Sequence, residues 1–364
     1  MSGSSRLGRP LQAVIRRSAF LANIREVERR CPESNTLVVL KADAYGHGMV
    51  ALAQMVGERD IAVATADEAQ VLVDAGVENR IWVLEGPLNM HCLSLATRHR
   101  VVWVIHDVTQ LDLLRAYAHV PLEVVLKLDT GMHRLGLDQA GLAMAVSALA
   151  ELDAVDVIAV MSHFASSDAP ASPSVAHQQA HFEALIASAG LDTTERSLSN
   201  SGAILYYPEA HQQWVRPGIM LYGAMPDPSQ NRDEVPLQAV MLLQSAVIAL
   251  HNIGPGESVG YGATWTAARP SLVATVAAGY ADGYPRHAPS GTPVAVNGVR
   301  CPLVGRVSMD MLAVDVTDLA EVAVGDPVEL WGEQVTVDEV AQAAGTIAYE
   351  LLTGVSARVP REYR

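Results

Sequence analysis

The chain has 364 residues, half of them hydrophobic, which suffices for two domains of ~100–200 residues each. Its 25 Lys and Arg residues against 40 Asp and Glu residues give a formal net charge of −15, so it repels phosphate backbones and anionic lipid surfaces. Cys31, Cys92 and Cys301 are odd in number and far apart, which argues against a disulfide framework or a zinc site. The first ten residues contain no apolar leader, and no later stretch reaches the ~18 apolar residues of a membrane helix. We therefore expect a cytoplasmic protein that binds neither nucleic acid, membrane nor metal.

Lysine is rare in this chain. Of the 25 basic residues, 23 are Arg, and only Lys41 and Lys127 are Lys. Arg replaces Lys on a solvated surface at little cost, but a guanidinium cannot lose its proton and attack a carbon atom. Each lysine ends an apolar run and is followed by Asp two residues later, in VVLKAD and VVLKLD. Their placement favours a chemical role over chance retention.

The chain between residues 36 and 222 alternates short apolar runs with segments of helical period. This pattern is typical of βα units around a parallel sheet. We expect strands at residues 36–40, 61–65, 81–85, 101–105, 122–128, 155–161, 196–199 and 214–216. Helical segments include residues 18–31, 66–75 and 172–189. Eight such units predict an α/β fold, namely a (β/α)8 barrel over residues 10–225. The sequence lacks the glycine motifs of Rossmann and P-loop nucleotide-binding proteins.

The chain after residue 225 has a different texture. A stretch rich in Pro, Asp, Ser and Asn at residues 226–233 is typical of a linker. Strands separated by Gly and Asn turns then follow at residues 240–250, 272–277, 293–296, 301–307, 312–316 and 327–330. They predict a β-rich C-terminal domain over residues 226–364. Residues 11–15 are a further candidate strand that could join this second domain.

Polar residues follow the predicted barrel strands, at the ends where (β/α)8 enzymes carry their reactive groups. They are Lys41, Glu85, His106, Asp129, Arg134, His163, Asn200, Ser201 and Arg216. The SNSG segment at residues 199–202 and the RPGI segment at 216–219 are typical of a phosphate site at the last two strands. A phosphate, a nearby Arg and a Lys that can form an imine together indicate pyridoxal 5'-phosphate.

Residues 39–48, VLKADAYGHG, resemble the cofactor-lysine segment of the alanine racemase family, whose members are pyridoxal-phosphate isomerases of fold type III. The resemblance extends over nearly the whole chain. It implies that Lys41 bonds to the cofactor and that Tyr45 contacts its phosphate. Residues 127–134, KLDTGMHR, resemble the segment whose Arg, here Arg134, contacts cofactor and substrate. The corresponding Lys, here Lys127, is often carbamylated in the family and then holds that Arg.

Three further segments resemble the family: SHFA at residues 162–165, SNS at 199–201 and VRPGI at 215–219. They imply cofactor contacts from Asn200, Ser201, Gly218 and Ile219. They also imply that His163 lies behind Arg216 and that Arg216 faces the pyridine nitrogen. An Arg keeps its proton, so the ring nitrogen stays unprotonated and the ring is a weaker electron sink. This favours rapid return of the proton, and so racemisation over transamination.

Racemisation needs one base on each face of the α-carbon. Lys41 can serve one face. In the second domain, residues 258–265, SVGYGATW, resemble the family segment with the opposing base, here Tyr261. Residues 305–310, GRVSMD, resemble the segment that binds the substrate carboxylate, here at Met309 and Asp310. The resemblance implies a homodimer that contributes Tyr261 and Met309 across its interface.

The chain departs from the family near its C-terminus. Ala357, in VSARVPR at residues 355–361, stands where well-known members carry a Tyr that contacts phosphate and narrows the entrance. Its small side chain leaves room for a substrate range broader than alanine. Ser308 replaces a Cys found in some members.

We therefore expect racemisation of L-alanine and D-alanine, with Lys41 and Tyr261 as bases and Arg134, His163 and Arg216 completing the catalytic set. Supply of D-alanine as a peptidoglycan precursor and degradation of D-alanine both remain open. One rival is a decarboxylase of the same fold, in which a carboxylate rather than Arg216 would face the ring nitrogen. Another is a non-catalytic pyridoxal-phosphate carrier, which would need only the barrel.

Overall fold

The computed structural model describes residues 8–229 and 235–364, and the chain divides into two compact units. One unit is Asn23–Leu221, and the other combines the chain before residue 23 with the chain from residue 222 onward. Residues 1–7 of the expected leaderless N-terminus and 230–233 of the expected linker lie outside the described residues. Among the described residues, no helix has the length and hydrophobicity needed to cross a membrane.

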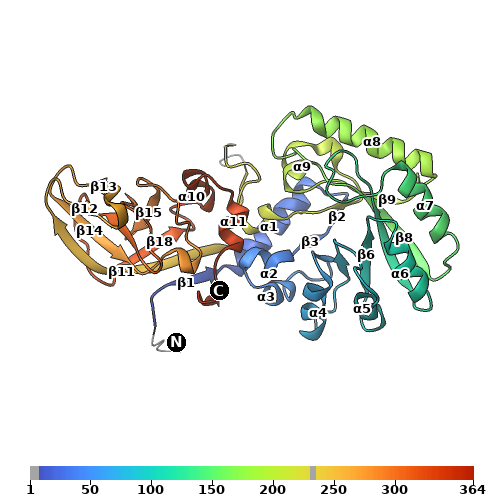
Figure 1. Cartoon of the computed structure of the whole chain (residues 1–364), viewed down its shortest axis with the longest axis horizontal. Coiled ribbons are helices and arrows are strands. Elements are labelled where there is room, and N and C mark those ends of the chain that lie inside the picture. The colour runs from blue at the N-terminus through green and yellow to red at the C-terminus, as the bar shows by residue number, and fades with distance from the viewer. Residues whose placement is uncertain (1–7, 230–234) are drawn as a thin grey trace. The chain divides into compact units, whose positions relative to one another are not determined.

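Within Asn23–Leu221, all strands belong to one parallel sheet of nine strands, in the order β2-β10-β9-β8-β7-β6-β5-β4-β3 (Figure 1). Their bounds are β2 (Asn35–Thr36), β3 (Val38–Val39), β4 (Ile61–Val63), β5 (Ile81–Val83), β6 (Val101–Ile105), β7 (Leu122–Lys127), β8 (Val155–Met161), β9 (Glu195–Ser197) and β10 (Trp214–Val215). Each of the eight expected apolar runs contributes to this sheet.

The first expected strand, at residues 36–40, is interrupted at Leu37 and closes the sheet. β2 pairs with β10, whereas β3 pairs with β4. The Leu37 N–H donates to the carbonyl of Val215 at 2.9 Å, and the Val38 N–H donates to the carbonyl of Asp60 at 2.9 Å. One short run of chain therefore joins both ends of the sheet, which confirms the expected barrel.

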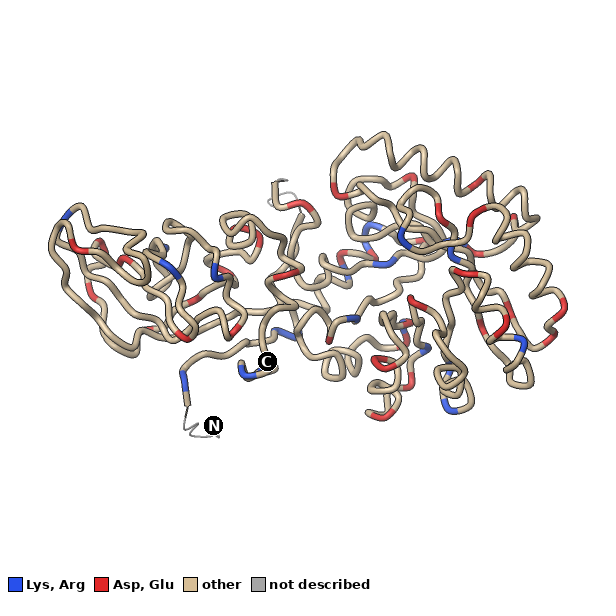
Figure 2. The backbone as a smooth tube through the Cα atoms, viewed as in Figure 1, with Lys and Arg blue, Asp and Glu red and all other residues tan. Residues whose placement is uncertain are grey.

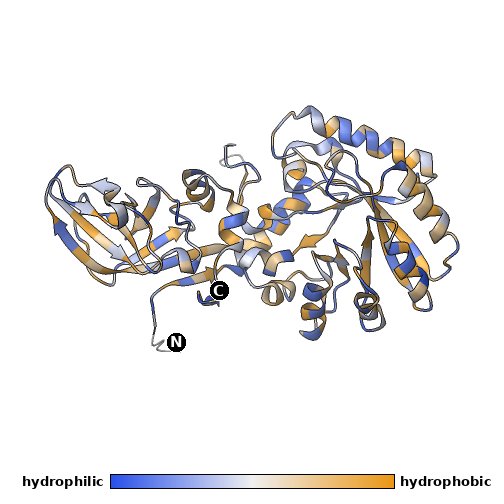
Figure 3. Ribbon diagram, viewed as in Figure 1, coloured by the Kyte–Doolittle hydropathy of each residue, from blue (hydrophilic) through white to orange (hydrophobic). Residues whose placement is uncertain are grey.

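Helices cover the outside of this barrel, and Figure 1 shows α4 to α8 arranged around the strands. The helical segments in and next to this unit are α1 (Arg17–Arg30), α2 (Lys41–Gly46), α3 (Met49–Ala53), α4 (Ala66–Asp74), α5 (Met90–Leu93), α6 (Gln110–Tyr117), α7 (Gln139–Leu149), α8 (Pro173–Ala189) and α9 (Ser201–Tyr206). Of these, α2 is left-handed from Ala42 to Tyr45. Pro173 begins α8, and Gly190, in the left-handed conformation, ends it. Figure 3 shows mostly hydrophobic barrel strands, whereas α8 carries both polar and apolar positions.

The barrel core consists of strand side chains that are buried almost throughout. Trp82 and Trp103 have no exposed surface, and every residue of β6 is buried. Each fully buried large apolar side chain contributes about 1.5–3 kcal/mol. This packing fixes the carboxyl ends of the strands, where the candidate site residues lie.

The β-rich unit contains a sheet of eight strands within residues 8–229 and 235–364, with β16-β15-β18-β11-β1-β19 in line and β14 bridging β11 and β17. The strands are β1 (Gln12–Ile15), β11 (Met241–Ile253), β14 (Ser271–Val276), β15 (Pro293–Val296), β16 (Val299–Pro302), β17 (Leu312–Asp315), β18 (Pro327–Trp331) and β19 (Arg361–Tyr363). The candidate strand at residues 11–15 is present as β1, which pairs antiparallel with β11. Figure 2 shows acidic positions scattered along both units.

The expected strand at residues 301–307 is wrong in its bounds. β16 runs only from Val299 to Pro302, because it forms a hairpin with β15 across Asn297 and Gly298, which both have positive φ. That turn sets the register, so β16 ends opposite Pro293, where β15 begins. This unit also contains helices α10 (Val337–Ala344) and α11 (Ala348–Thr353) and a short ribbon of β12 (Ser258–Val259) and β13 (Trp265–Thr266).

Candidate active site

The structure places the barrel's candidate residues just beyond the carboxyl ends of its strands. In chain order they follow, or end, β3, β5, β6, β7, β8, β9 and β10: Lys41, Glu85, His106, Lys127 with Asp129 and Arg134, His163, Asn200 with Ser201, and Arg216. Parallel strands of one barrel present these ends at the same rim, which brings the side chains together. Tyr261, Met309 and Asp310 belong to the other unit.

Lys41 begins a left-handed turn. Ala42, Asp43, Ala44 and Tyr45 all have φ between +52° and +54°. None of them is Gly, and the left-handed helical conformation costs roughly 1–2 kcal/mol for each such residue. Hydrogen bonds within the loop offset part of this cost: the Ala44 N–H donates to the Leu40 carbonyl at 2.7 Å, and the Met49 N–H donates to Asp43 Oδ1 at 2.7 Å.

A close-packed cradle lies around Gly218. A Cβ atom at Gly218 would come within 2.5 Å of the Tyr45 hydroxyl oxygen, so only Gly fits here. The Ser201 hydroxyl oxygen accepts the N–H of Gly218 at 2.8 Å and that of Met220 at 3.4 Å. Asn200 caps α9 by accepting the Ala203 N–H at 3.1 Å. The hydroxyl groups of Tyr45 and Ser201, from two other segments of the chain, therefore lie against Gly218.

Arg216 is buried and bound on several sides. Its guanidinium donates to the Ser197 hydroxyl and to the Ser162 carbonyl, both at 2.6 Å, and to the Leu198 carbonyl at 3.2 Å. Its Nη2 lies 3.3 Å from Nδ1 of His163. Burial lowers the pKa of Arg216 to about 10, which leaves the guanidinium protonated at neutral pH. The site therefore holds a fixed, buried positive charge.

The two lysines lie in this positive environment. Burial, followed by the charges of Arg216 and Arg134, lowers the pKa of Lys127 to about 8. Burial, followed by the charge of Arg134, also lowers the pKa of Lys41. Their amines therefore lose a proton more readily than ordinary lysines do.

Nearby carboxylates oppose this lowering of the pKa values of Lys41 and Lys127 only in part. Glu68 and Glu85 favour the protonated form of Lys41, and Asp129 favours that of Lys127. Asp129 itself accepts the N–H groups of Gly131 and His133, each at 3.0 Å. Four cationic side chains, two of them lysines and two arginines, thus influence one another in a place suited to an anionic ligand.

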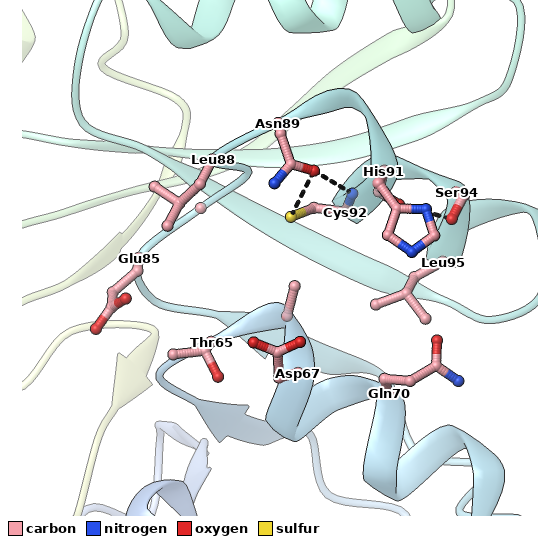
Figure 4. Close-up of a pocket in the computed structure, with 12 residues that line it drawn as sticks. Thr65, Asp67, Gln70, Glu85, Leu88, Asn89, His91, Cys92, Ser94 and Leu95 are labelled. Carbon is pink, nitrogen blue, oxygen red and sulfur yellow. Dashed lines mark hydrogen bonds between the residues drawn. The ribbon is translucent and has the colours of Figure 1, made fainter.

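A cavity of about 220 Å³ lies next to this rim. Figure 4 shows Asp67 and Gln70 on the α4 side, with Asn89 and Cys92 on the segment after β5 across from them. Glu85 lies at its edge, so it both lines the cavity and acts on the charge of Lys41. The Cys92 thiol donates to Asn89 Oδ1 at 3.4 Å.

The candidate residues of the β-rich unit are exposed within it. Tyr261 lies on a 3₁₀ turn, Tyr261–Ala263, and is 71% exposed, and Met309 is 53% exposed. The chain before Met309 is tied to residues 279–282, because the N–H of Tyr280 donates to the Ser308 carbonyl at 3.0 Å. Two large side chains at the surface of this unit are therefore available to a ligand or partner.

Glu68 and Asp282, which the sequence did not single out as site residues, bind groups in the segments that carry the candidate residues. Glu68 accepts the Ala42 N–H at 2.6 Å, next to Lys41. Asp282 is 1% exposed, and its carboxylate binds Arg9 at 2.8 Å and Arg358 at 2.6 Å. Arg358 also binds Asp310 at 2.5 Å. The only signal in the sequence was the T-x-x-E capping pattern at Thr65 and Glu68.

Comparison with known proteins gives one consistent result. Residues 15–226 match the family model for the N-terminal domain of alanine racemase, and residues 240–363 match that for its C-terminal domain. The chain is 47% identical over 358 residues to the "Alanine racemase, biosynthetic" of Pseudomonas aeruginosa, which covers 98% of this chain and 99% of that protein.

Solved structures agree with this comparison. A crystal structure of the biosynthetic alanine racemase from Pseudomonas aeruginosa superposes with a TM-score of 0.92 at 46% identity, covering 98% of this chain and 100% of that one. Alanine racemase from Bartonella henselae, described with covalently bound pyridoxal phosphate, superposes with a TM-score of 0.89 at 30% identity, covering 98% and 100%. The resemblance stated from the sequence motifs is confirmed: the chain belongs to the alanine racemase family, a family of amino-acid isomerases.

Proposed function

We propose that this protein is a pyridoxal-phosphate-dependent racemase that interconverts L-alanine and D-alanine by two bases. The observation that carries the proposal is the lowered pKa of Lys41 in a pocket of buried positive charge, beside the cradle at Gly218. A lysine in this state has a neutral, nucleophilic amine at lower pH than usual. The names of the relatives support the choice of alanine as substrate.

The residues present fit pyridoxal phosphate. The phosphate would lie against Tyr45, Ser201, Gly218 and Ile219, with Asn200 capping the helix beneath it. The Tyr45 hydroxyl can approach the Gly218 backbone this closely because residue 218 has no Cβ, which would lie 2.5 Å from the hydroxyl oxygen. The cationic side chains around Lys41 supply the charge that an anionic cofactor needs. When bound, the cofactor would supply an aldehyde for Lys41 and a ring that withdraws electrons from the substrate α-carbon.

Arg216 would determine the reaction type. It faces the ring nitrogen in this proposal and keeps its proton, because its pKa of about 10 is well above neutral pH. A protonated guanidinium has no acceptor, so it cannot stabilise a proton on the ring nitrogen. With its nitrogen unprotonated, the ring would be a weaker electron sink, so the α-carbon would regain its proton quickly. Quick return of the proton favours racemisation. His163 and the carbonyls of Ser162 and Leu198 hold Arg216 in this orientation.

Lys41 and Tyr261 would serve as the two bases, one for each face of the α-carbon. We propose a homodimer in which the partner copy supplies Tyr261 and Met309. The exposure of both side chains within their own unit, 71% and 53%, supports this assembly. Arg134 and the Met309–Asp310 segment would hold the substrate carboxylate, and the barrel rim would exclude water from the α-carbon.

Lys127 would be carbamylated in this proposal. Carbon dioxide adds only to a neutral amine, with loss of one proton, and gives a negative carbamate. With a pKa of about 8, roughly one-tenth of Lys127 is neutral at pH 7. The carbamate would pair with Arg134 and hold its guanidinium toward the cofactor.

We propose a substrate range broader than alanine because Ala357 leaves the entrance open. The biosynthetic designation of the Pseudomonas aeruginosa relative supports supply of D-alanine as a peptidoglycan precursor, in the cytoplasm. Circular dichroism of L-alanine incubated with the purified enzyme and added cofactor tests the proposed activity. Decay of the signal to zero supports a racemase, whereas carbon dioxide release identifies a decarboxylase and an unchanged signal a carrier.

A further inference from the structure

The carboxylate of Glu68 binds two separate parts of the barrel rim. Its Oε1 accepts the N–H of Ala42 at 2.6 Å, 26 residues away in the chain. Its Oε2 accepts the N–H of Ala64 at 2.7 Å, directly after β4. Glu68 is the third residue of α4 and belongs to its capping box with Thr65. One side chain therefore joins the residue after Lys41 to the end of the neighbouring strand.

The backbone that Glu68 binds is the strained part of the Lys41 loop. Ala42 is the first of four consecutive residues with φ near +53°, a conformation that non-Gly residues seldom adopt. Within this turn, the N–H of Ala44 donates to the Leu40 carbonyl. The Ala42 N–H donates instead to a side chain from another element, so the start of the turn depends on Glu68.

We propose that Glu68 is a positioning residue for Lys41: by binding the Ala42 N–H it holds the left-handed turn and thereby fixes where the Lys41 amine lies. The role of Lys41 rests on the function proposed above, but the contact of Glu68 with its loop does not. Among the charged groups that act on the Lys41 amine, Arg134 and Arg216 disfavour its protonation, and Glu68 and Glu85 favour it. Glu68 therefore contributes both geometry and charge.

The variant Glu68→Gln keeps the size of the side chain but removes its charge and one of its two acceptors. The matched control is Thr65→Ala, which breaks the other half of the same capping box, the bond from the Glu68 N–H to the Thr65 hydroxyl at 3.2 Å. Both variants weaken the start of α4, and their thermal unfolding temperatures should fall by similar amounts. Only Glu68→Gln loses the pair of carboxylate oxygens that accepts the N–H groups of both Ala42 and Ala64.

The first measurement is the titration of the Lys41 amine in the full-length chain after treatment with hydroxylamine to remove cofactor. Competitive acetylation over a range of pH, read by mass spectrometry, is simple because the chain contains only two lysines. Glu68→Gln should lower the pKa of Lys41 by about half a unit or more, since a charge favouring the ammonium form is lost. Lys127, whose pKa is set mainly by burial and by Arg216 and Arg134, is the comparison within the same chain and should shift less than Lys41.

The second measurement is alanine racemisation by the cofactor-loaded variants. Glu68→Gln should lower kcat roughly tenfold while KM changes less than about twofold, because a misplaced base slows proton transfer more than it weakens binding. Thr65→Ala should keep the wild-type kcat. Amide hydrogen exchange of the peptide containing residues 42–48 should become faster in Glu68→Gln alone.

An unchanged Lys41 titration in Glu68→Gln, or an equal shift in Thr65→Ala, would overturn the proposal. If Glu68→Gln does not fold, Glu68→Asp replaces it: the shorter side chain keeps the charge but cannot reach both parts of the rim. Exchange at residues 42–48 as slow as in the wild type would then contradict the role of Glu68. Absence of racemase activity in the wild type would reject the proposed function and leave the acetylation result to decide on Glu68.

Discussion

Nη2 of Arg216 lies 3.3 Å from Nδ1 of His163, and this contact fixes the state of the imidazole. A guanidinium only donates hydrogen bonds, so Nδ1 must accept and the ring proton must be on Nε2. Burial, together with the charge of Arg216, lowers the pKa of His163 well below its usual value, which keeps the ring neutral. His163 thus accepts a hydrogen bond from Arg216 without placing a second positive charge beside it.

Replacing Arg134 by Gln should raise the pKa of Lys41. Arg134 is the charged group that lowers this pKa most, after burial. With the guanidinium gone, the ammonium form becomes more stable and the amine loses its proton at higher pH. Competitive acetylation of Lys41 measures the shift, which is opposite in sign to that expected for Glu68→Gln. A shift to lower pH would show that Arg134 does not act on Lys41 in this way.

Replacing Gly218 by Ala should weaken binding of pyridoxal phosphate about tenfold or more. The new Cβ would lie 2.5 Å from the Tyr45 hydroxyl oxygen, and overpacking of this kind costs about 1–3 kcal/mol. Titration of the cofactor-free chain, followed by visible absorbance, gives the affinity. Wild-type affinity in the single variant would exclude this cradle as the phosphate site.

Replacing Asp282 by Asn should lower the free energy of unfolding by about 2 kcal/mol, because a buried carboxylate that binds two arginines loses its charge. KM for alanine should also rise, since the N–H of Ala281 donates to the Met309 carbonyl at 3.0 Å. Denaturant unfolding and initial rates measure the two effects. The control Asp318→Asn breaks an ion pair whose carboxylate is 80% exposed and should cost less than about 0.5 kcal/mol. Equal costs in both variants would contradict a structural role for Asp282.

Replacing Ala357 by Tyr should narrow the substrate range. Ala357 is exposed in its own unit, and the family resemblance puts this position at the entrance. We expect the ratio of kcat/KM for L-serine to that for L-alanine to fall about tenfold, a range typical of small changes in pocket size. Racemisation rates for a panel of L-amino acids provide the test. An unchanged ratio would mean that Ala357 does not limit the entrance.

The barrel was predictable because most of its strands are short, largely apolar runs that alternate with segments of helical period, as in a parallel sheet covered by helices. β6, for example, lies at residues 101–105, as its sequence VVWVI predicts. The polar residues after most of these runs then marked the rim, and the motif around Lys41 indicated the family. Local sequence sufficed for both inferences.

The left-handed turn after Lys41 was not predictable. Ala and Tyr seldom adopt positive φ, and a run of four such residues has no sequence signal; we infer that Glu68 and neighbouring backbone groups hold it in the folded chain. The buried Asp282 was missed for the same reason, since its partners Arg9 and Arg358 are 273 and 76 residues away. The bounds of β16 were wrong because the turn at Asn297 and Gly298, rather than hydrophobicity, sets them.

Borohydride reduction of the cofactor-loaded enzyme, followed by peptide mapping, tests whether Lys41 bonds to pyridoxal phosphate. Reduction makes the bond between a lysine and pyridoxal phosphate permanent, and this chain offers only Lys41 and Lys127. We expect a phosphopyridoxyl group on the peptide containing Lys41, and we expect it to be absent in Lys41→Ala. A label on Lys127, or no label in an enzyme that racemises alanine, would contradict this expectation.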